Sequence, residues 1–344
     1  MGCKTNDMEP KRRTREELLQ DYLEKYEGYG LNSIAKALAA HYPDEFKNSE
    51  CARNALRRRV GSFGKAERKR RGQTKSSHDG KKHQQNPFGL PFGDSNDYSH
   101  YKVKPKNMDV MVLADAHVPF HRTDALTTVI QRGKKLKPEL LILNGDWLDC
   151  HRLSRFNKEP GTRNFKGELK VLREVLDKVT NEISPREVVY KQGNHEERYQ
   201  SYMSARAPEL LELEKHVAFE DIVGFDLLGI EYVDDRRIIE VGHLNIIHGH
   251  EYRSSPFSPV NPAKAYYTKA KSNILVAHHH RSSQHTDKDI RDAIQSAWSM
   301  GCLCDLSPAY MPKNDWNLGF VEIELEKSGD FRLRNKGIFD GKIL

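Results

Sequence analysis

The chain has 344 residues, 37% of them hydrophobic, and a formal net charge of +7. This length exceeds one typical domain, so we expect two units. No window approaches the roughly 18 consecutive apolar residues of a membrane span, and the charged N-terminus lacks the apolar core of a signal peptide, so neither a membrane span nor secretion is indicated. The five cysteines show no Cys-x-x-Cys spacing and predict no disulfide framework, so a cytoplasmic location is expected.

Three short helices are predicted in the first 60 residues. Thr14-Arg-Glu-Glu17 is a capping box that precedes apolar residues at helical spacing. Asn32 and Ser33 are expected to cap the second helix, and Asn48 and Ser49 the third.

Positive charge is concentrated in and after the third helix. The segment from Arg53 to Lys82 contains twelve Lys or Arg residues and only two acidic residues, Glu67 and Asp79, which is an excess of +10. Three short helices, the last of them rich in arginine, resemble a helix-turn-helix DNA-binding module, which implies a nucleic-acid partner. The alternative is a small helical bundle with a solvated charged tail. The candidate nucleic-acid contacts are Arg53, Arg57, Arg58, Arg59, Arg68, Lys69, Arg70 and Arg71.

A change of composition separates this region from the rest of the chain. Residues 72–107 are rich in Gly, Pro, Ser, Asp and His and predict a flexible linker. The predicted domains are therefore a helical basic domain at 1–71, a linker at 72–107 and a larger domain at 108–344.

Within the larger domain, five segments end in residue types that bind metals. Each follows a short run of apolar or β-branched residues that predicts a strand, namely Met108–Ala114, Leu140–Leu143, Val188–Tyr190, Leu244–Ile247 and Asn273–Ala277. A parallel-type sheet would bring all five carboxyl ends to one rim, where α/β folds place their sites. The segments are Asp115-Ala-His117, Gly145-Asp146-Trp-Leu-Asp149, Gly193-Asn194-His195-Glu196, His248-Gly-His250 and His278-His-His280.

These residue types suit a pair of divalent cations. In an extended chain, residues two apart face the same side, so Asp115 and His117 can bind one cation together. Gly145 allows a sharp turn after which the two carboxylate oxygens of Asp146 can bridge two cations. Mixed oxygen and imidazole ligands favour Mn²⁺, Fe or Zn²⁺ over Mg²⁺ or Ca²⁺, and we expect two divalent ions, with Mn²⁺ the first choice.

The order of these blocks resembles that of the calcineurin-like metallophosphoesterase superfamily. The resemblance implies an α/β fold in which two mixed β-sheets pack face to face and are flanked by helices, here preceded by a small all-α N-terminal domain. It implies one metal on Asp115, His117, Asp146 and His280, and a second on Asp146, Asn194, His248 and His278. His195 would be the proton donor, oriented by Asp149.

The implied reaction is phosphoester hydrolysis. Two cations about 3.5–4 Å apart can hold a bridging hydroxide for in-line attack on phosphorus. A histidine held by a carboxylate can then protonate the leaving oxygen.

Departures from the family pattern bear on the substrate. The Ser/Thr protein phosphatase branch carries phosphate-clamping arginines where this chain has Cys150 and Gln192. Arg152 and Arg198 are possible phosphate contacts, because guanidinium matches phosphate geometry, although each is as easily explained as a surface charge.

Three functions remain open at this stage. We predict first a phosphodiesterase acting on nucleic acid. The alternatives are a protein or small-molecule phosphatase with the N-terminal domain as adaptor, and a DNA-binding regulator with a vestigial catalytic fold. The sequence does not predict the oligomeric state.

The C-terminal part predicts further strands at Ile294–Met300, Gly319–Leu325 and Phe331–Arg334, which we expect to complete a second sheet. Pro308–Trp316, rich in Tyr, Pro and Asn, predicts a loop.

Overall fold

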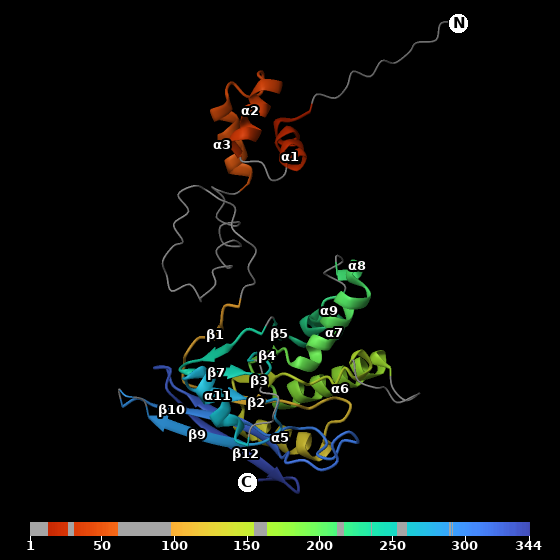
Figure 1. Cartoon of the computed structure of the whole chain (residues 1–344), viewed down its shortest axis with the longest axis vertical. Helices are drawn as coiled ribbons and strands as arrows, with labels where there is room; N and C mark the ends of the chain where they lie inside the picture. The colour runs from red at the N-terminus through yellow and green to blue at the C-terminus, as the bar shows by residue number, and fades with distance from the viewer. Residues whose placement is uncertain are drawn as a thin grey trace, which may run out of the picture. The chain divides into compact units, whose positions relative to one another are not determined.

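The structure is a computed structural model that describes residues 13–26, 31–60, 98–154, 164–211, 217–234, 236–252, 260–288, 290 and 292–344. The chain divides into two compact units, Met1–His83 and Gln84–Leu344 (Figure 1). Arg68, Lys69, Arg70, Arg71 and most of the predicted linker lie outside the described residues.

The N-terminal unit contains α1 (Arg15–Lys25), α2 (Leu31–His41) and α3 (Ser49–Arg59), which pack around a small apolar core. The predicted capping box of α1 is present, because the side chain of Thr14 accepts the Glu17 N–H and that of Glu17 accepts the Thr14 N–H. Asn48 caps α3 as predicted. The prediction for α2 was wrong: the helix begins at Leu31, so Asn32 and Ser33 lie within its first turn.

The connection between α2 and α3 spans residues 42–48. A helix-turn-helix motif usually joins its two helices by a turn of about three to four residues, so this connection is longer than that of the motif. The resemblance to that module stays a prediction.

Two mixed sheets build the second unit. The seven-stranded sheet has the order β13-β12-β11-β2-β3-β4-β5, and the six-stranded sheet the order β1-β6-β7-β8-β10-β9. Strands of the first are β2 (Met108–Leu113), β3 (Leu140–Asn144), β4 (Glu187–Lys191), β5 (Ile230–Val233), β11 (Leu318–Leu325), β12 (Phe331–Phe339) and β13 (Lys342–Ile343). Strands of the second are β1 (Tyr101–Val103), β6 (Ile239–Val241), β7 (Leu244–Ile247), β8 (Ile274–Val276), β9 (Ser283–Lys288) and β10 (Ile294–Ser299).

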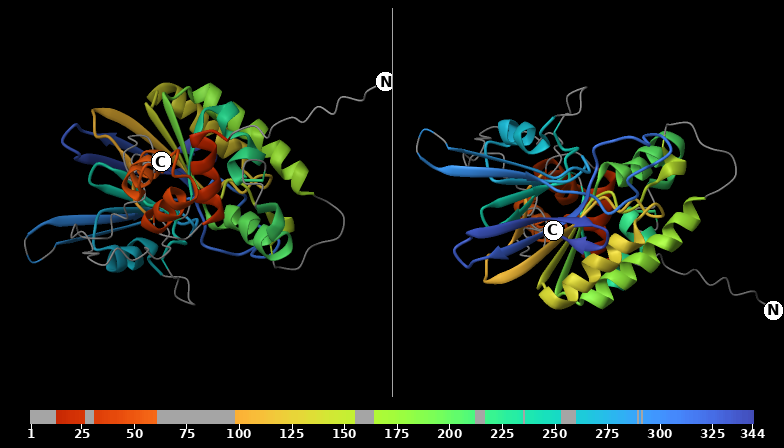
Figure 2. Two further views of the ribbon diagram at one scale, coloured as in Figure 1. Left: turned by 90° about the horizontal axis from the view of Figure 1, so that it is seen from above. Right: turned by 90° about the horizontal axis from the view of Figure 1, so that it is seen from below.

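Helices cover the outer faces of both sheets, which confirms the predicted fold (Figure 2). Helices α5 (Thr123–Leu136) and α6 (Phe165–Ile183) pack on the seven-stranded sheet, and α11 (Pro262–Ala270) packs on the six-stranded sheet. An apolar layer that includes Val112, Ile142 and Ile246 fills the space between the two sheets. Short elements complete the unit: η1 (His151–Leu153), α7 (Asn194–Arg206), α8 (Pro208–Leu211), α9 (Phe219–Val223) and α10 (Phe225–Leu228).

The strands that precede the five motifs form as predicted, but they do not share one sheet. β2, β3 and β4 are parallel neighbours in the seven-stranded sheet, whereas β7 and β8 are parallel neighbours in the six-stranded sheet. The later strands also divide: β10 joins β8, while β11 and β12 extend the other sheet beyond β2. The expectation of a single parallel sheet was therefore wrong, and the site is built where the ends of two sheets meet.

The strand β1 lies within the predicted linker. Tyr101–Val103 pairs in parallel with β6 in the six-stranded sheet. The ordered second unit thus begins before residue 108.

Candidate metal centre

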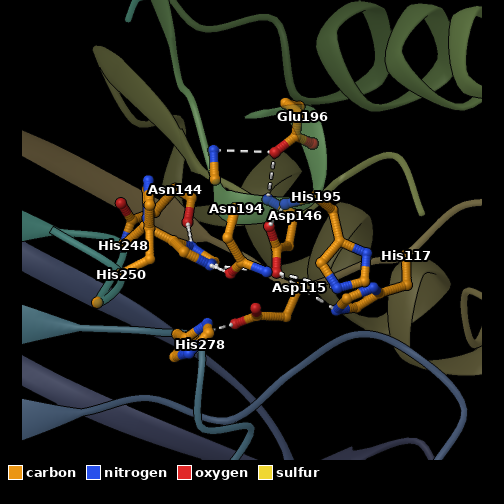
Figure 3. A network of polar contacts seen from close by, with 12 residues as sticks. Asp115, His117, Asn144, Asp146, Asn194, His195, Glu196, His248, His250 and His278 are labelled. Carbon is orange, nitrogen blue, oxygen red and sulfur yellow. Dashed lines mark hydrogen bonds and ion pairs between the residues drawn. The ribbon is translucent and has the colours of Figure 1, made fainter. Parts of the chain in front are cut away.

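The structure brings all seven predicted ligands to one place, at the carboxyl ends of β2, β3, β4, β7 and β8. Figure 3 labels all of them except His280. Strand register places these ends together, because Leu113 pairs with Leu143 and Asn144 with Lys191. The side-chain amide of Asn144 donates to the Ile247 carbonyl (2.9 Å) and joins the two sheets at this edge.

Asp146 lies at the centre of the cluster and is fully buried. Its Oδ2 lies 3.2 Å from His248 Nε2 and 3.9 Å from His117 Nε2. Two groups with the spacing of metal ligands share this residue: Asp115, His117 and Asp146, and Asp146, His248 and His278.

The remaining predicted ligands complete these groups. His280 Nε2 lies 3.3 Å from Asp115 Oδ1 and 3.1 Å from His117 Nε2. Asn194 Oδ1 lies 3.2 Å from His248 Nε2, and His248 Nδ1 is bonded to the Asn144 carbonyl, which turns Nε2 toward Asp146.

The backbone at this site is unusual. Five of the predicted ligands have a positive φ, namely Asp115 (54°), His117 (47°), Asp146 (53°), His278 (65°) and His280 (55°). This left-handed region is sparsely populated by residues other than glycine and costs on the order of 1–3 kcal/mol per residue. Such strain concentrates at functional sites, because it aims side chains that ordinary strands would not.

Gly145 meets a steric requirement of the same cluster. Its φ is +81°, and a Cβ there would lie 2.5 Å from His248 Nδ1. Any side chain at this position would displace a candidate ligand.

The donor set fits cations. Burial and the nearby His195 lower the pKa of His117, whose Nδ1 lies 3.1 Å from Asp149 Oδ1, so a neutral ring directs the lone pair of Nε2 at Asp146 and His280. Burial and His248 lower the pKa of His278 to about 3, and its buried Nδ1 has no hydrogen-bond partner among the described residues. Burial lowers the pKa of His248, but Asp146 raises it to about 10, so this imidazole is held next to a carboxylate at a position where a cation could take the place of its proton. Imidazoles and carboxylates that converge in this way are ligand types that divalent metals bind.

His195, the predicted proton donor, stands beside this cluster. Its Nδ1 lies 2.8 Å from the Asp149 carbonyl and 3.1 Å from Asp149 Oδ1. Burial opposes ionisation of Asp149, but hydrogen bonds with His117 and His195 hold its pKa well below the usual range. An ionised Asp149 therefore orients the imidazole of His195.

Arg198 of α7 contacts the same histidine. Its Nη2 donates to His195 Nε2 (2.8 Å) and its Nη1 to the Asp149 carbonyl (2.9 Å). Arg152, the other predicted phosphate contact, lies in η1, three residues after Asp149, and is half-buried.

Sequence reasoning gave no role to Glu196, which the structure makes a structural centre of the site. This buried carboxylate accepts the backbone N–H groups of Asp146, Trp147, Leu148 and Gly193 and the hydroxyl of Tyr190, all within 2.7–3.0 Å. Because every partner donates, the carboxylate holds the loops after β3 and β4 together.

A second buried carboxylate was also missed. Glu251 accepts the backbone N–H groups of His248 (2.9 Å) and Gly249 (2.7 Å). Burial raises its pKa, but the fully buried ammonium of Lys191, 2.8 Å away, lowers it to about 2. The ion pair joins the end of β4 to the loop after β7.

His250 belongs to a separate network. Its Nε2 lies 2.8 Å from Glu197 Oε1, and Arg236 binds the same carboxylate through two nitrogens. Burial opposes ionisation of Glu197, yet His250 and Arg236 lower its pKa to about 2. The His250 ring also lies edge-on to the ring of the candidate ligand His248, with centroids 5.4 Å apart, so His250 neighbours the cluster while its Nε2 is bound to Glu197.

Comparison with known proteins identifies the family. Residues 108–308 match the family model described as calcineurin-like phosphoesterase. The chain belongs to this family. Its relatives include the gene 54 protein of Mycobacterium phage D29, which is 24% identical over 183 residues, or 50% of this chain and 69% of the relative.

Solved structures similar to this phosphoesterase include a single-substitution variant of Vps29 from Entamoeba histolytica, with a TM-score of 0.36, 16% identity and coverage of 69% of this chain and 96% of the other. Another is the nuclease MPE of Pseudomonas putida, with a TM-score of 0.33, 12% identity and coverage of 68% and 85%.

Family membership supports a phosphoester hydrolase, and the His and Asp cluster supplies candidate ligands for the two divalent metals typical of the family. In the part of the chain that the structure describes, no helix combines the length and apolarity needed to cross a membrane.

Proposed function

We propose that this chain is a dinuclear metal-dependent phosphoesterase that cleaves phosphodiester bonds in nucleic acid. The observation that carries the metal-dependent part is the position of Asp146, the residue common to two groups of converging ligands. A vestigial fold would not be expected to keep all seven ligand side chains together, which disfavours the regulator alternative.

Each metal would have its own ligands in addition to Asp146. Asp115, His117 and His280 would hold one metal with it, and Asn194, His248 and His278 the other. When bound, such ions supply Lewis acidity and a water that is acidic enough to act as nucleophile near neutral pH. The remaining chemistry belongs to residues of the chain that are not ligands.

His195 is the proposed proton donor to the leaving oxygen. It lies at the border of the cluster, its Nδ1 side is fixed by Asp149, and its Nε2 lies 3.7 Å from Asp146 Oδ2. In the structure Arg198 donates to Nε2, so this nitrogen carries no proton, and His195 can act as the donor only after Arg198 moves and Nε2 takes up a proton from solvent. A phosphate oxygen is the natural new partner for this guanidinium.

His195→Ala is expected to retain both metals and to lose rate by about 10²–10⁴-fold on a diester with a poor leaving group. A diester with a very acidic leaving group should be much less affected, because it needs no proton. Metal analysis and kcat for the two substrates measure this. Equal losses on both substrates would show that His195 has another role.

Arg198→Met is expected to lower kcat/KM by roughly 10–100-fold, because one charge-assisted contact to phosphate is lost. Arg198→Lys should recover only part of the lost kcat/KM, since an ammonium cannot bind phosphate with two parallel hydrogen bonds. Arg206→Met is a matched control, an exposed arginine in the last turn of the same helix. Similar kcat/KM values for the Arg198 and Arg206 variants would remove Arg198 from the site.

The nucleic-acid part of the proposal rests on the N-terminal unit. Arg58 and Arg59 of α3 are exposed, while Arg53 bonds to Glu50 and Asn32, and Arg59 also bonds to Gln20. The basic residues that follow α3 add to this charge in the sequence.

Affinity for duplex DNA is expected to fall steeply with salt. If roughly five to eight of the charges between Arg53 and Lys82 contact phosphates, log affinity should change with log salt with a slope of about −0.9 per contact. A chain truncated to begin at Gln84 keeps β1 and the whole second unit, and should hydrolyse a small chromogenic diester while losing most of the DNA affinity. Equal affinities at the same salt would favour the adaptor alternative, with a phosphoprotein or a small phosphate ester as substrate.

A further inference from the structure

The loop predicted at Pro308–Trp316 borders the metal centre. The Trp316 ring packs against His280, with ring centroids 4.2 Å apart and planes at 73°. The next residue, Asn317, donates its N–H to the His280 carbonyl (2.9 Å). The end of the loop is therefore fixed to a candidate metal ligand.

Polar contacts hold the shape of this loop. The side-chain amide of Asn314 donates to the carbonyls of Leu306 (2.8 Å) and Met311 (2.9 Å), and its oxygen accepts the Trp316 N–H (3.0 Å). Because one amide joins the start, the tip and the end, the loop does not need to bury its large apolar side chains in order to keep its conformation.

Those side chains are displayed to solvent. Tyr310 is 74% exposed, and its ring centroid lies 6.4 Å from that of Trp316. Through Trp316, which packs on His280, the ring of Tyr310 is connected to the edge of the metal centre.

A third aromatic ring stands next to the first ligand motif. Phe120 is 42% exposed, its N–H donates to the His117 carbonyl (2.6 Å), and its carbonyl accepts the Asp305 N–H (2.8 Å). The metal centre is thus bordered by exposed or half-exposed aromatic side chains from two separate segments, the one after β2 and the one after β10.

Aromatic rings at the edge of a phosphoesterase site suit a substrate that carries a planar ring beside its phosphate. A nucleobase is such a ring, and stacking on protein aromatics is a general mode of binding for single strands. Bases inside a duplex are already stacked on both faces, so only an unpaired base is available. We infer that Tyr310, Trp316 and Phe120 form a stacking surface for the unpaired base next to the scissile phosphate, an inference that rests on the proposed function.

Two diesters with the same leaving group test the stacking surface. Thymidine 5′-(p-nitrophenyl phosphate) and methyl p-nitrophenyl phosphate differ only in the nucleoside, and both are assayed with the full chain and Mn²⁺. The thymidine ester should have the higher kcat/KM, by roughly five- to 100-fold and mainly through KM. A ratio near one would overturn the inference and leave the proposed function intact. If neither diester is hydrolysed, the proposed function and the inference both fail.

Variants of Tyr310 assign the effect to the surface. Tyr310→Leu should lower the ratio of the two kcat/KM values about fivefold or more, and Tyr310→Phe, which keeps the ring, should restore it. Phe339→Leu, at a 66% exposed aromatic residue of β12, is the matched control and should keep the wild-type ratio. An unchanged ratio in Tyr310→Leu would contradict a stacking role.

Oligonucleotides distinguish an unpaired from a paired base. A single-stranded DNA should be cleaved faster than the same sequence in a duplex, and the preference should shrink in Tyr310→Leu. Equal cleavage of both forms by the wild type, or a preference for a phosphotyrosine peptide over either diester, would overturn the assignment to an unpaired base.

Discussion

Asp146→Asn is expected to abolish hydrolysis and to reduce bound metal below two equivalents. The residue is fully buried, and its Oδ2 is 3.2 Å from one candidate imidazole ligand and 3.9 Å from another. A neutral amide offers one oxygen and no charge, so it cannot bridge two cations as a carboxylate does. Loss of several kcal/mol of transition-state stabilisation corresponds to a decrease of at least about 10³-fold in kcat.

Metal analysis and kcat on a chromogenic diester measure the result. Asp330→Asn is the matched control, because the side chain of Asp330 is 72% exposed and distant in sequence from every motif, and it should retain wild-type metal content and rate. Two full equivalents of metal in Asp146→Asn would refute the bridging role.

Lys191→Met is expected to destabilise the chain by about 3–5 kcal/mol, because it leaves the buried carboxylate of Glu251 without its countercharge. The loop that carries His248 should also loosen, since Glu251 holds its backbone N–H groups. Affinity for metal should then fall roughly 10–100-fold, the usual effect of removing a group that orients a ligand. Urea unfolding and metal titration measure the two effects separately.

An exposed ion pair provides the control. Lys134 and Glu182 lie 2.5 Å apart with side chains that are 54% and 47% exposed, so Lys134→Met should cost only about 0–1 kcal/mol. The double variant Lys191→Met with Glu251→Gln should recover part of the lost stability, because no buried charge remains unpaired. Equal costs for Lys191→Met and Lys134→Met would show that the buried pair does not anchor the loop.

Local sequence identified the candidate ligands because each motif is short and follows a strand. The extended-chain reason given for pairing Asp115 with His117 was wrong, since both residues have a positive φ. The division of the five strands between two sheets was not predictable from the same patterns, since a buried parallel strand has the same kind of apolar sequence in either sheet.

The groups that support the ligands depend on contacts distant in sequence. Lys191 and Glu251 are sixty positions apart, and a lysine at a strand end is ordinarily exposed, so nothing in the pattern indicates an ion pair. Trp316 and His280 lie 36 positions apart and meet only because β10 joins β8 in one sheet while β11 joins β2 in the other. These contacts follow from topology and not from periodicity.

The left-handed backbone at the candidate ligands strains the chain at the positions where the proposed activity needs a side chain. At His117 and His280 glycine would adopt the observed φ without steric strain, so replacing either with glycine would relieve the backbone while removing an imidazole. The imidazoles at these two positions are thus kept in spite of the strain in the backbone that carries them, as expected where a side chain is retained for chemistry rather than for stability.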